Sequence, residues 1–265
     1  MWTSVRSAMV VIGVAAATLV TPPATSSAAA SQPPGADIAS IQPASGALVG
    51  VAHPVVVTFA TPVIDRLAAE RSIAVRSNPP MTGSFDWVDD TEVQWVPDHY
   101  WPSHSSVALS VGKLSVDFST GAKVVGVASL SAHTFTVTVD GEDPGPLPTP
   151  HHRPHWGEEG VMPATMGKVE YETPTGNYTV LGKDKRVLMD SSSVGVPIDS
   201  AEGYRFEVDN AVRITRRGLY VHSAPWALRS LGLENVSHGC VGLSPADAEW
   251  YFDRVNIGDP VIIKE

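Results

Sequence analysis

The chain has one cysteine, Cys240, among its 265 residues, so disulfides within the molecule are excluded and its domains must hold together by burial alone. Basic residues are also few. The 18 Lys and Arg against 28 Asp and Glu give a formal net charge of −10, without a basic run. This acidic balance argues against nucleic acid as a partner. No apolar run reaches the roughly 20 residues that a membrane-spanning helix needs.

The first residues form a secretory pattern. An apolar run over residues 8–20 follows a single charge, Arg6, and precedes a stretch of small residues that ends at Ala30. This order predicts a signal peptide over residues 1–30, followed by a short leader over residues 31–36. Without a cysteine near the cut, a lipoprotein is excluded. We therefore expect an exported protein of the periplasm or cell wall, or one retained at the outer face of the plasma membrane if the segment is an uncleaved anchor.

Residues 37–130 contain about seven short strand-like runs punctuated by Pro, Gly, Asn or Asp. Several runs alternate apolar and polar residues, which favours an immunoglobulin-like β-sandwich. We interpret Trp87, Trp95 and Trp101 as packing residues, with a carbohydrate-stacking surface as the alternative. The clearest runs cover residues 55–59, 73–75, 85–87, 92–96, 106–111 and 115–118.

Residues 131–265 are also predicted to be mainly β, with a short C-terminal helix. The helix is indicated by Ser244 as the N-cap, Pro245 in the first turn and Asp247 at the third helical position, with apolar residues at helical spacing as far as Gly258. A Pro- and Gly-rich stretch before it holds three close histidines. We expect a solvent-exposed loop there rather than a metal site, and predict no metal or cofactor. These histidines are His151, His152 and His155.

The surroundings of the single thiol indicate nucleophilic chemistry. A thiolate is the reactive form of cysteine, and a histidine is the usual base that generates it. Two candidates exist: His222, at the end of a predicted strand, and His238, two residues before Cys240. Gly239 lets the backbone approach a tetrahedral oxyanion, so the amides of residues 238–240 are candidate donors. The alternative is a buried structural cysteine with unrelated histidines.

Beyond these residue types, the local sequence resembles the active-site region of L,D-transpeptidases with a YkuD-type catalytic domain, of the mycobacterial and actinobacterial type. The resemblance covers about 135 residues, which implies that residues 131–265 form the catalytic domain. The β-sandwich before it also fits this family's architecture. The matching segments are residues 166–168, 173–178, 189–192, 222–226 (His-Ser-Ala-Pro-Trp), 236–241 (Val-Ser-His-Gly-Cys-Val) and 243–250.

The resemblance implies a cysteine acyltransferase that forms 3→3 cross-links in peptidoglycan and reacts with carbapenems. Cys240 would attack the donor tetrapeptide stem between meso-diaminopimelate and the terminal D-alanine, and His222 would take the thiol proton and return one to the leaving amine. Ser223 would hold the His222 ring through its carbonyl or hydroxyl. The acyl group would then pass to the side-chain amine of diaminopimelate on an acceptor stem. His238 and Gly239 would shape the oxyanion region.

The resemblance also implies residues that contact the stem peptides. Arg217 is not of the residue type that the family has at its position, and we include it for its backbone and for its attraction to stem carboxylates. The predicted substrate-binding residues are Met189, Tyr204, Arg217, Gly218, Trp226 and Ser237.

The chain departs from the family pattern at two positions. Gly242 stands where the family usually has Asn, and Val194 stands where relatives often carry a second tyrosine in the lid over the cleft. We predict an active, monomeric enzyme with altered substrate handling. Within the same chemistry, an L,D-carboxypeptidase or an acyltransferase that attaches other groups to the stem is the alternative. A wall-binding module with a degenerate site is the alternative of another class.

Overall fold

The computed structural model describes residues 37–148, 158 and 160–265. The predicted signal peptide and leader lie outside these residues, as do the three histidines of the Pro- and Gly-rich stretch. Among the described residues, no helix is both long and apolar enough to cross a membrane.

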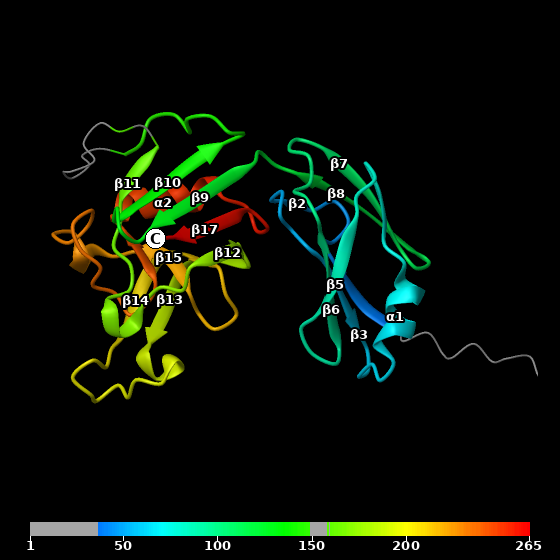
Figure 1. Cartoon of the computed structure of the whole chain (residues 1–265), viewed down its shortest axis with the longest axis horizontal. Coiled ribbons are helices and arrows are strands. Elements are labelled where there is room, and N and C mark those ends of the chain that lie inside the picture. The colour runs from blue at the N-terminus through cyan, green and yellow to red at the C-terminus, as the bar shows by residue number, and fades with distance from the viewer. Residues whose placement is uncertain (1–36, 149–157, 159) are drawn as a thin grey trace, which may run out of the picture. The chain divides into compact units, whose positions relative to one another are not determined.

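Two four-stranded sheets form the first part of the chain (Figure 1). Within β3 and β7 the buried residues alternate with more exposed ones, so each strand turns one face toward the space between the sheets. The first sheet has the order β1 (Ile38–Gln42), β3 (Val55–Phe59), β6 (Glu92–Pro97) and β5 (Gly83–Trp87). The second has the order β2 (Leu48–Val49), β8 (Leu114–Thr120), β7 (Ser106–Val111) and β4 (Arg76–Asn78).

The tryptophans of this region are packing residues. Trp95 and Trp101 are 5% and 1% exposed, and their ring centroids lie 5.9 Å apart. Trp101 also meets the edge of the Phe118 ring at 5.5 Å. Trp87 is partly buried and stacks on Phe59. The apolar core of the sandwich thus contains packed aromatic rings beside its buried valines.

A helix that the sequence pattern does not predict, α1 (Arg66–Ile73), lies between β3 and β4. The expected strand over residues 73–75 is therefore wrong. The Asp65 side chain caps the helix by accepting a hydrogen bond from the Ala68 N–H at 2.9 Å. Ala69 and Ile73 bury its inner face. The helix has only eight residues, so it offers few apolar positions from which a helical period could be recognised.

The second part of the chain contains two further sheets (Figure 1). The five-stranded sheet has the order β11 (Val161–Pro163), β10 (Thr134–Val139), β9 (Val124–Ser129), β17 (Pro260–Lys264) and β12 (Gly176–Thr179). The four-stranded sheet has the order β13 (Gly182–Asp190), β14 (Arg205–Arg213), β15 (Tyr220–Ser223) and β16 (Val241–Leu243). Strand β9 precedes residue 131 but pairs with β10 and β17. The limits of the two domains stay a prediction.

Helix α2 (Pro245–Arg254) is the predicted C-terminal helix, and it contacts β14, β15 and β16. Ser244 caps it by accepting from the Asp247 N–H at 3.1 Å. The fully buried Tyr251 meets Phe135 of the five-stranded sheet edge to face at 4.8 Å. The helix thus joins both sheets in one apolar core, which fixes the backbone of β15 and β16.

Candidate active site

Parallel pairing of β15 and β16 brings the thiol and an imidazole into one cavity. His222 on β15 lies opposite Gly242 on β16, and Cys240 immediately precedes β16. His222 and Cys240 both line a cavity of about 290 Å³. All residues of β15 and β16 are buried, so the strands hold both groups on fixed backbone.

The ring of His222 is oriented by main chain. Its Nδ1 atom lies 2.8 Å from the carbonyl oxygen of Ser223. Because a carbonyl oxygen only accepts hydrogen bonds, Nδ1 carries the proton and Nε2 presents a free lone pair. Burial lowers the pKa of His222, and the hydrogen bond to Ser223 only partly opposes this effect. The imidazole is therefore neutral at neutral pH and able to accept a proton.

The thiol of Cys240 is protonated in the resting structure. Burial raises its pKa to about 11, and a backbone hydrogen bond from Tyr220 opposes the rise. The sulfur donates to the carbonyl oxygen of Gly218 at 3.8 Å. Gly218, predicted to contact substrate, thus directly contacts the thiol.

The turn before Cys240 is tied internally. Ser237 Oγ donates to the Cys240 carbonyl oxygen at 2.6 Å and accepts from the Gly239 N–H at 3.1 Å. Thr173 Oγ1 donates to the Gly239 carbonyl oxygen at 2.6 Å. Gly239 has φ +121°, a conformation that favours glycine. The Gly239 amide, one of the predicted oxyanion donors, is therefore engaged by Ser237.

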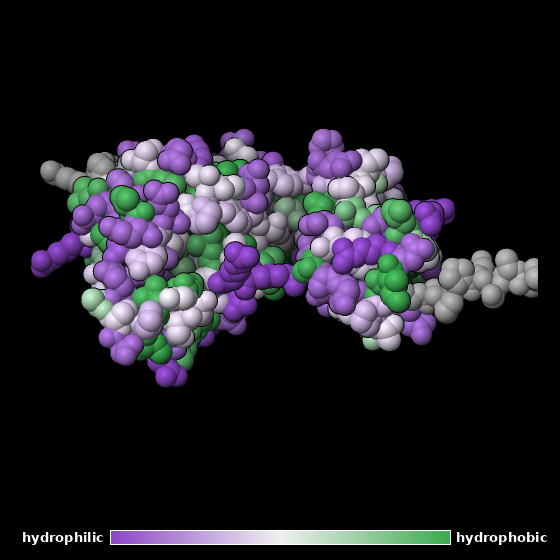
Figure 2. All heavy atoms as spheres, turned by 60° about the horizontal axis from the view of Figure 1, so that its bottom comes forward, coloured by the Kyte–Doolittle hydropathy of each residue, from purple (hydrophilic) through white to green (hydrophobic). Residues whose placement is uncertain are grey.

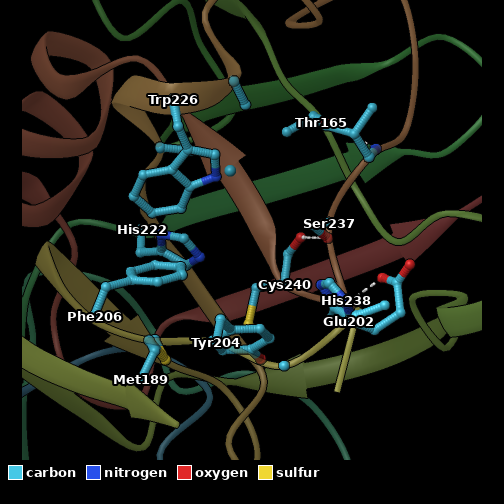
Figure 3. Close-up of a pocket in the computed structure, with 16 residues that line it drawn as sticks. Thr165, Met189, Glu202, Tyr204, Phe206, His222, Trp226, Ser237, His238 and Cys240 are labelled. Atoms are coloured by element: carbon cyan, nitrogen blue, oxygen red, sulfur yellow. Dashed lines mark hydrogen bonds and ion pairs between the residues drawn. The ribbon is translucent and has the colours of Figure 1, made fainter. Parts of the chain in front are cut away.

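The ring of His238 is engaged away from the thiol. Its Nε2 atom lies 3.0 Å from Glu202 Oε2 (Figure 3). The ring centroid lies 4.6 Å from that of Tyr171 and 5.0 Å from that of Tyr204. Of the two histidines that the sequence offers as bases, His222 keeps its Nε2 atom unengaged, whereas the Nε2 atom of His238 is held by Glu202.

Two cavities meet at Cys240, and the predicted substrate-binding residues divide between them. The first cavity contains Trp226 and Ser237, and the second, of about 500 Å³, contains Arg217 and Gly218. Both cavities are lined by Met189, Tyr204, His238 and Cys240. Figure 3 shows Tyr204 and Met189 beside the sulfur, with Trp226 above His222.

The first cavity also contains residues that the sequence did not single out. Phe206 meets Trp226 edge to face at 4.6 Å, so an aromatic pair borders His222. Glu202 precedes Tyr204 by two residues and bonds to His238. Thr165 lies in a segment about 75 residues before Cys240, and no local signal connects it to the site.

Close packing explains Gly242, the main departure from the family pattern. Gly242 and Thr165 form an antiparallel bridge with hydrogen bonds in both directions, of 2.8 and 3.0 Å. A Cβ atom at position 242 would lie 2.9 Å from both Ala224 Cβ and Thr165 Cγ2. This distance is shorter than real Cβ contacts, so the floor of the first cavity has no room for a side chain there.

No group of three or more His, Cys, Asp or Glu side chains that could hold a metal ion occurs within residues 37–148, 158 and 160–265.

Apolar side chains reach solvent near the end of β13 and in the segment after it. Figure 2 shows hydrophobic residues among polar ones on the molecular surface. Leu188, Val194 and Ile198 are 51%, 47% and 43% exposed.

A thiol and an oriented imidazole thus lie at the meeting point of two cavities on a β-rich scaffold. Comparison with known families agrees with the architecture. Residues 14–117 match the bacterial Ig domain family, and residues 127–263 match the L,D-transpeptidase catalytic domain family.

Individual relatives match nearly the whole chain. The probable L,D-transpeptidase 3 of Mycobacterium tuberculosis is 60% identical over 264 residues, which cover 97% of each chain. L,D-transpeptidase 1 of the same organism is 48% identical and covers 94% of this chain and 90% of the relative. The chain belongs to the L,D-transpeptidase family. The predicted family and fold class are confirmed.

Solved structures of relatives superpose closely on this one. L,D-transpeptidase 3 from Mycobacterium tuberculosis, in complex with a faropenem-derived adduct, gives a TM-score of 0.83 at 64% identity, covering 87% of this chain and 99% of that one. The LD transpeptidase LdtMt1 in complex with imipenem gives a TM-score of 0.76 at 48% identity, covering 86% and 98%.

Proposed function

We propose that this protein is an exported peptidoglycan L,D-transpeptidase that forms 3→3 cross-links, with Cys240 as the nucleophile and His222 as the general base. One observation carries this proposal. The parallel pairing of β15 with β16 brings the thiol to a cavity that also holds a neutral imidazole, whose Nε2 lone pair is free because Ser223 binds Nδ1. The engaged ring of His238 supports the choice of His222 as the base.

In the acylation step, Cys240 Sγ attacks the donor carbonyl between meso-diaminopimelate and the terminal D-alanine. His222 Nε2 takes the thiol proton as the carbon–sulfur bond forms. The carbon–nitrogen bond then breaks, and the same proton passes to the nitrogen of the departing D-alanine. Because the resting thiol is protonated, this proton must leave the sulfur for the thioester to form.

In the second step, the side-chain amine of an acceptor diaminopimelate attacks the thioester carbonyl. His222 takes a proton from the attacking amine and returns it to the sulfur as the carbon–sulfur bond breaks. The product is an amide between the two stems, and the thiol is regenerated. No cofactor is needed for this balance.

The negatively charged oxygen of each tetrahedral intermediate needs a hydrogen-bond donor to stabilise it. Since Ser237 Oγ already holds the Gly239 N–H, we assign this role to the Cys240 N–H of the same turn. Ser237 then acts by bracing the turn through the Cys240 carbonyl oxygen. Three arginines, Arg213, Arg216 and Arg217, line the second cavity, against the two carboxylates of Glu172 and Asp190. This excess of positive charge favours stem peptides that carry carboxylates.

The faropenem-derived adduct in one relative and the complex of another relative with imipenem support the expectation that Cys240 is acylated by carbapenems. The test is the intact mass of the mature protein after incubation with imipenem, beside the Cys240→Ala variant. We expect a covalent adduct on the wild type alone. If neither protein gains mass, and neither consumes a disaccharide-tetrapeptide, the proposal fails.

The same incubation with disaccharide-tetrapeptide distinguishes the alternatives. A dimer with loss of one D-alanine supports transpeptidation. A tripeptide without a dimer indicates an L,D-carboxypeptidase, and incorporation of an added amine or amino acid indicates attachment to the stem. Absence of all three products, with Cys240 intact, would indicate a wall-binding module.

A further inference from the structure

We propose that Glu202 is a positioning residue that holds the lid closed over Cys240. The lid comprises residues 195–204, between the short helix η2 (Ser191–Val194) and β14. This inference rests on the proposed function, because it assigns a role to the lid of that same site. It concerns access to the thiol rather than the bond-forming steps.

Glu202 joins the lid to two other segments. Its Oε2 atom lies 2.6 Å from Lys168 Nζ and 3.0 Å from His238 Nε2 (Figure 3). Lys168 belongs to the segment that follows β11, and its N–H donates to the Ser237 carbonyl oxygen at 3.0 Å. His238 belongs to the turn before Cys240. One carboxylate oxygen therefore connects the lid directly to the turn before Cys240, through His238, and indirectly through Lys168, whose main chain is bonded to Ser237.

The same contact supports Tyr204. The His238 ring contacts the rings of both Tyr171 and Tyr204, at centroid distances of 4.6 and 5.0 Å. At its base, the lid is fixed by main chain, since the Tyr204 N–H donates to Ser191 Oγ and the Tyr204 carbonyl accepts from the Ser191 N–H, both at 3.0 Å. Glu202 is thus the side-chain tie that keeps the outer part of the lid against His238.

Charge favours this tie at neutral pH. The hydrogen bond from Lys168 is the main cause that lowers the pKa of Glu202, and His238 contributes next. The pKa of Lys168 is correspondingly raised by Glu202. The pair is partly exposed, so its effect on global stability is small. A small local free energy is nevertheless enough to shift a lid equilibrium by a few-fold.

The position of the lid matters because its residues Ala201, Glu202 and Gly203 line the first cavity beside the thiol. Loosening the outer lid moves this wall of the first cavity. We therefore expect loss of the tie to widen access to Cys240, with a larger effect on bulky reactants than on small ones.

Because Cys240 is the single thiol of the chain, its alkylation reports access directly. The experiment measures, by intact mass, the rates at which the free protein reacts with N-methylmaleimide and with a maleimide bearing a neutral polyethylene glycol chain. Both reagents carry the same reactive group. The ratio of the bulky to the small rate therefore cancels any change in thiol pKa that the variants cause.

In Glu202→Gln and in Lys168→Met, we expect this ratio to rise at least about 3-fold over the wild type. The matched control is Glu207→Gln, which removes an exposed carboxylate on β14 that contacts Arg186 and lines neither cavity. Its ratio should remain that of the wild type. An unchanged ratio in both lid variants, or an equal rise in the control, overturns the proposal.

The outcome is independent of transpeptidation, because alkylation requires only the thiol. Failure of cross-linking with a shifted ratio would reject the proposed function and retain the lid tie. A further readout is acylation by imipenem: we expect Glu202→Gln to change the concentration for half-maximal rate by about 3-fold, with the maximal rate nearly constant. A fall in the maximal rate alone would contradict a positioning role through the lid.

Discussion

The Nδ1 atom of His222 donates to the main-chain carbonyl oxygen of Ser223 at 2.8 Å. In many enzymes a carboxylate side chain orients the catalytic imidazole, but here the orienting oxygen belongs to the backbone. It sets the tautomer without adding a negative charge beside the ring. The identity of the side chain at position 223 is therefore secondary to the conformation of the strand that carries it.

This geometry predicts that Ser223→Ala retains most of its activity. The carbonyl oxygen is kept in the variant, so the tautomer of His222 is unchanged. We expect the rate of acylation by imipenem to stay within about 3-fold of the wild type. A loss of more than about 10-fold, with folding intact by circular dichroism, would assign the orienting role to the hydroxyl instead.

Replacement of the proposed base has a much larger effect. In His222→Ala, the imidazole that we propose as the base is absent, so acylation should slow by at least about 10²-fold, the low end for a general base. His238→Ala serves as the comparison, and its effect on the same rate should be smaller. Equal effects of the two substitutions, or an unchanged rate in His222→Ala, would move the base role away from His222.

The raised pKa of Cys240, about 11, predicts that the thiol of the free enzyme reacts slowly with alkylating reagents. In the free enzyme, the rate of alkylation by iodoacetamide should still be rising between pH 8 and pH 10, because the thiolate fraction grows throughout this range. A plateau below pH 8 would indicate a thiolate paired with protonated His222. Substrate-dependent acylation should differ, since the neutral imidazole removes the proton during attack.

The lowered pKa of His222 sets the acid side of the activity profile. The imidazole must be neutral to act as a base, and burial keeps it neutral to a pH below the ordinary value of 6.5. Acylation by imipenem should therefore persist below pH 6.5 and fall only in more acidic solution. A half-maximal rate at or above pH 7 would contradict a buried neutral base.

Close packing at Gly242 predicts a cost for any side chain there. Gly242→Ala introduces a Cβ atom 2.9 Å from Ala224 and Thr165, so we expect a loss of about 1–3 kcal/mol in the free energy of unfolding. Gly182→Ala is the control, because an added Cβ meets nothing within 4 Å. Urea denaturation measures both. Equal stability of the two variants would show that the cavity floor adjusts freely.

The buried carboxyl group of Asp259 should make the free energy of unfolding depend on pH. It is fully buried, and burial raises its pKa from 3.8 to about 6. A carboxyl group that holds its proton more tightly when folded stabilises the fold in acid, and this stabilisation is lost as the pH rises from 4 to 6. The term amounts to at most about 3 kcal/mol. In Asp259→Asn, this decrease in the free energy of unfolding between pH 4 and pH 6 should disappear. In Asp184→Asn, at an exposed site, the decrease should remain.

The sequence predicted those features that local pattern controls. The capping residues of α2 and the alternating strands of the sandwich were accessible, because each depends on residues close together in the chain. His222 and Cys240 were named from their residue types and the family resemblance, whereas the pairing of β15 with β16 that brings them to one cavity was visible only in the structure. Helix α1 was missed because eight residues with few apolar positions carry little periodicity. Its cap at Asp65 was the available signal.

Contacts between segments that are distant in the sequence could not be predicted from local sequence patterns. Thr165 meets Gly242 only because the segment after β11 bridges to β16, and Lys168 reaches Glu202 across 34 positions of sequence. The glycine at position 242 was recognised as a departure from the family, but its cause was visible only in the packing. The amide of Gly239 was predicted to be a free donor, whereas Ser237 Oγ engages it.

The burial of Cys240 has a chemical consequence beyond its pKa. Oxidation by peroxide proceeds through the thiolate, so a sulfur that keeps its proton at neutral pH is a poor target for sulfenic acid formation. The chain has no second cysteine to form a disulfide that could later be reduced. In the oxidising compartment that we propose, the raised pKa of this partly buried thiol thus protects it from oxidation between turnovers.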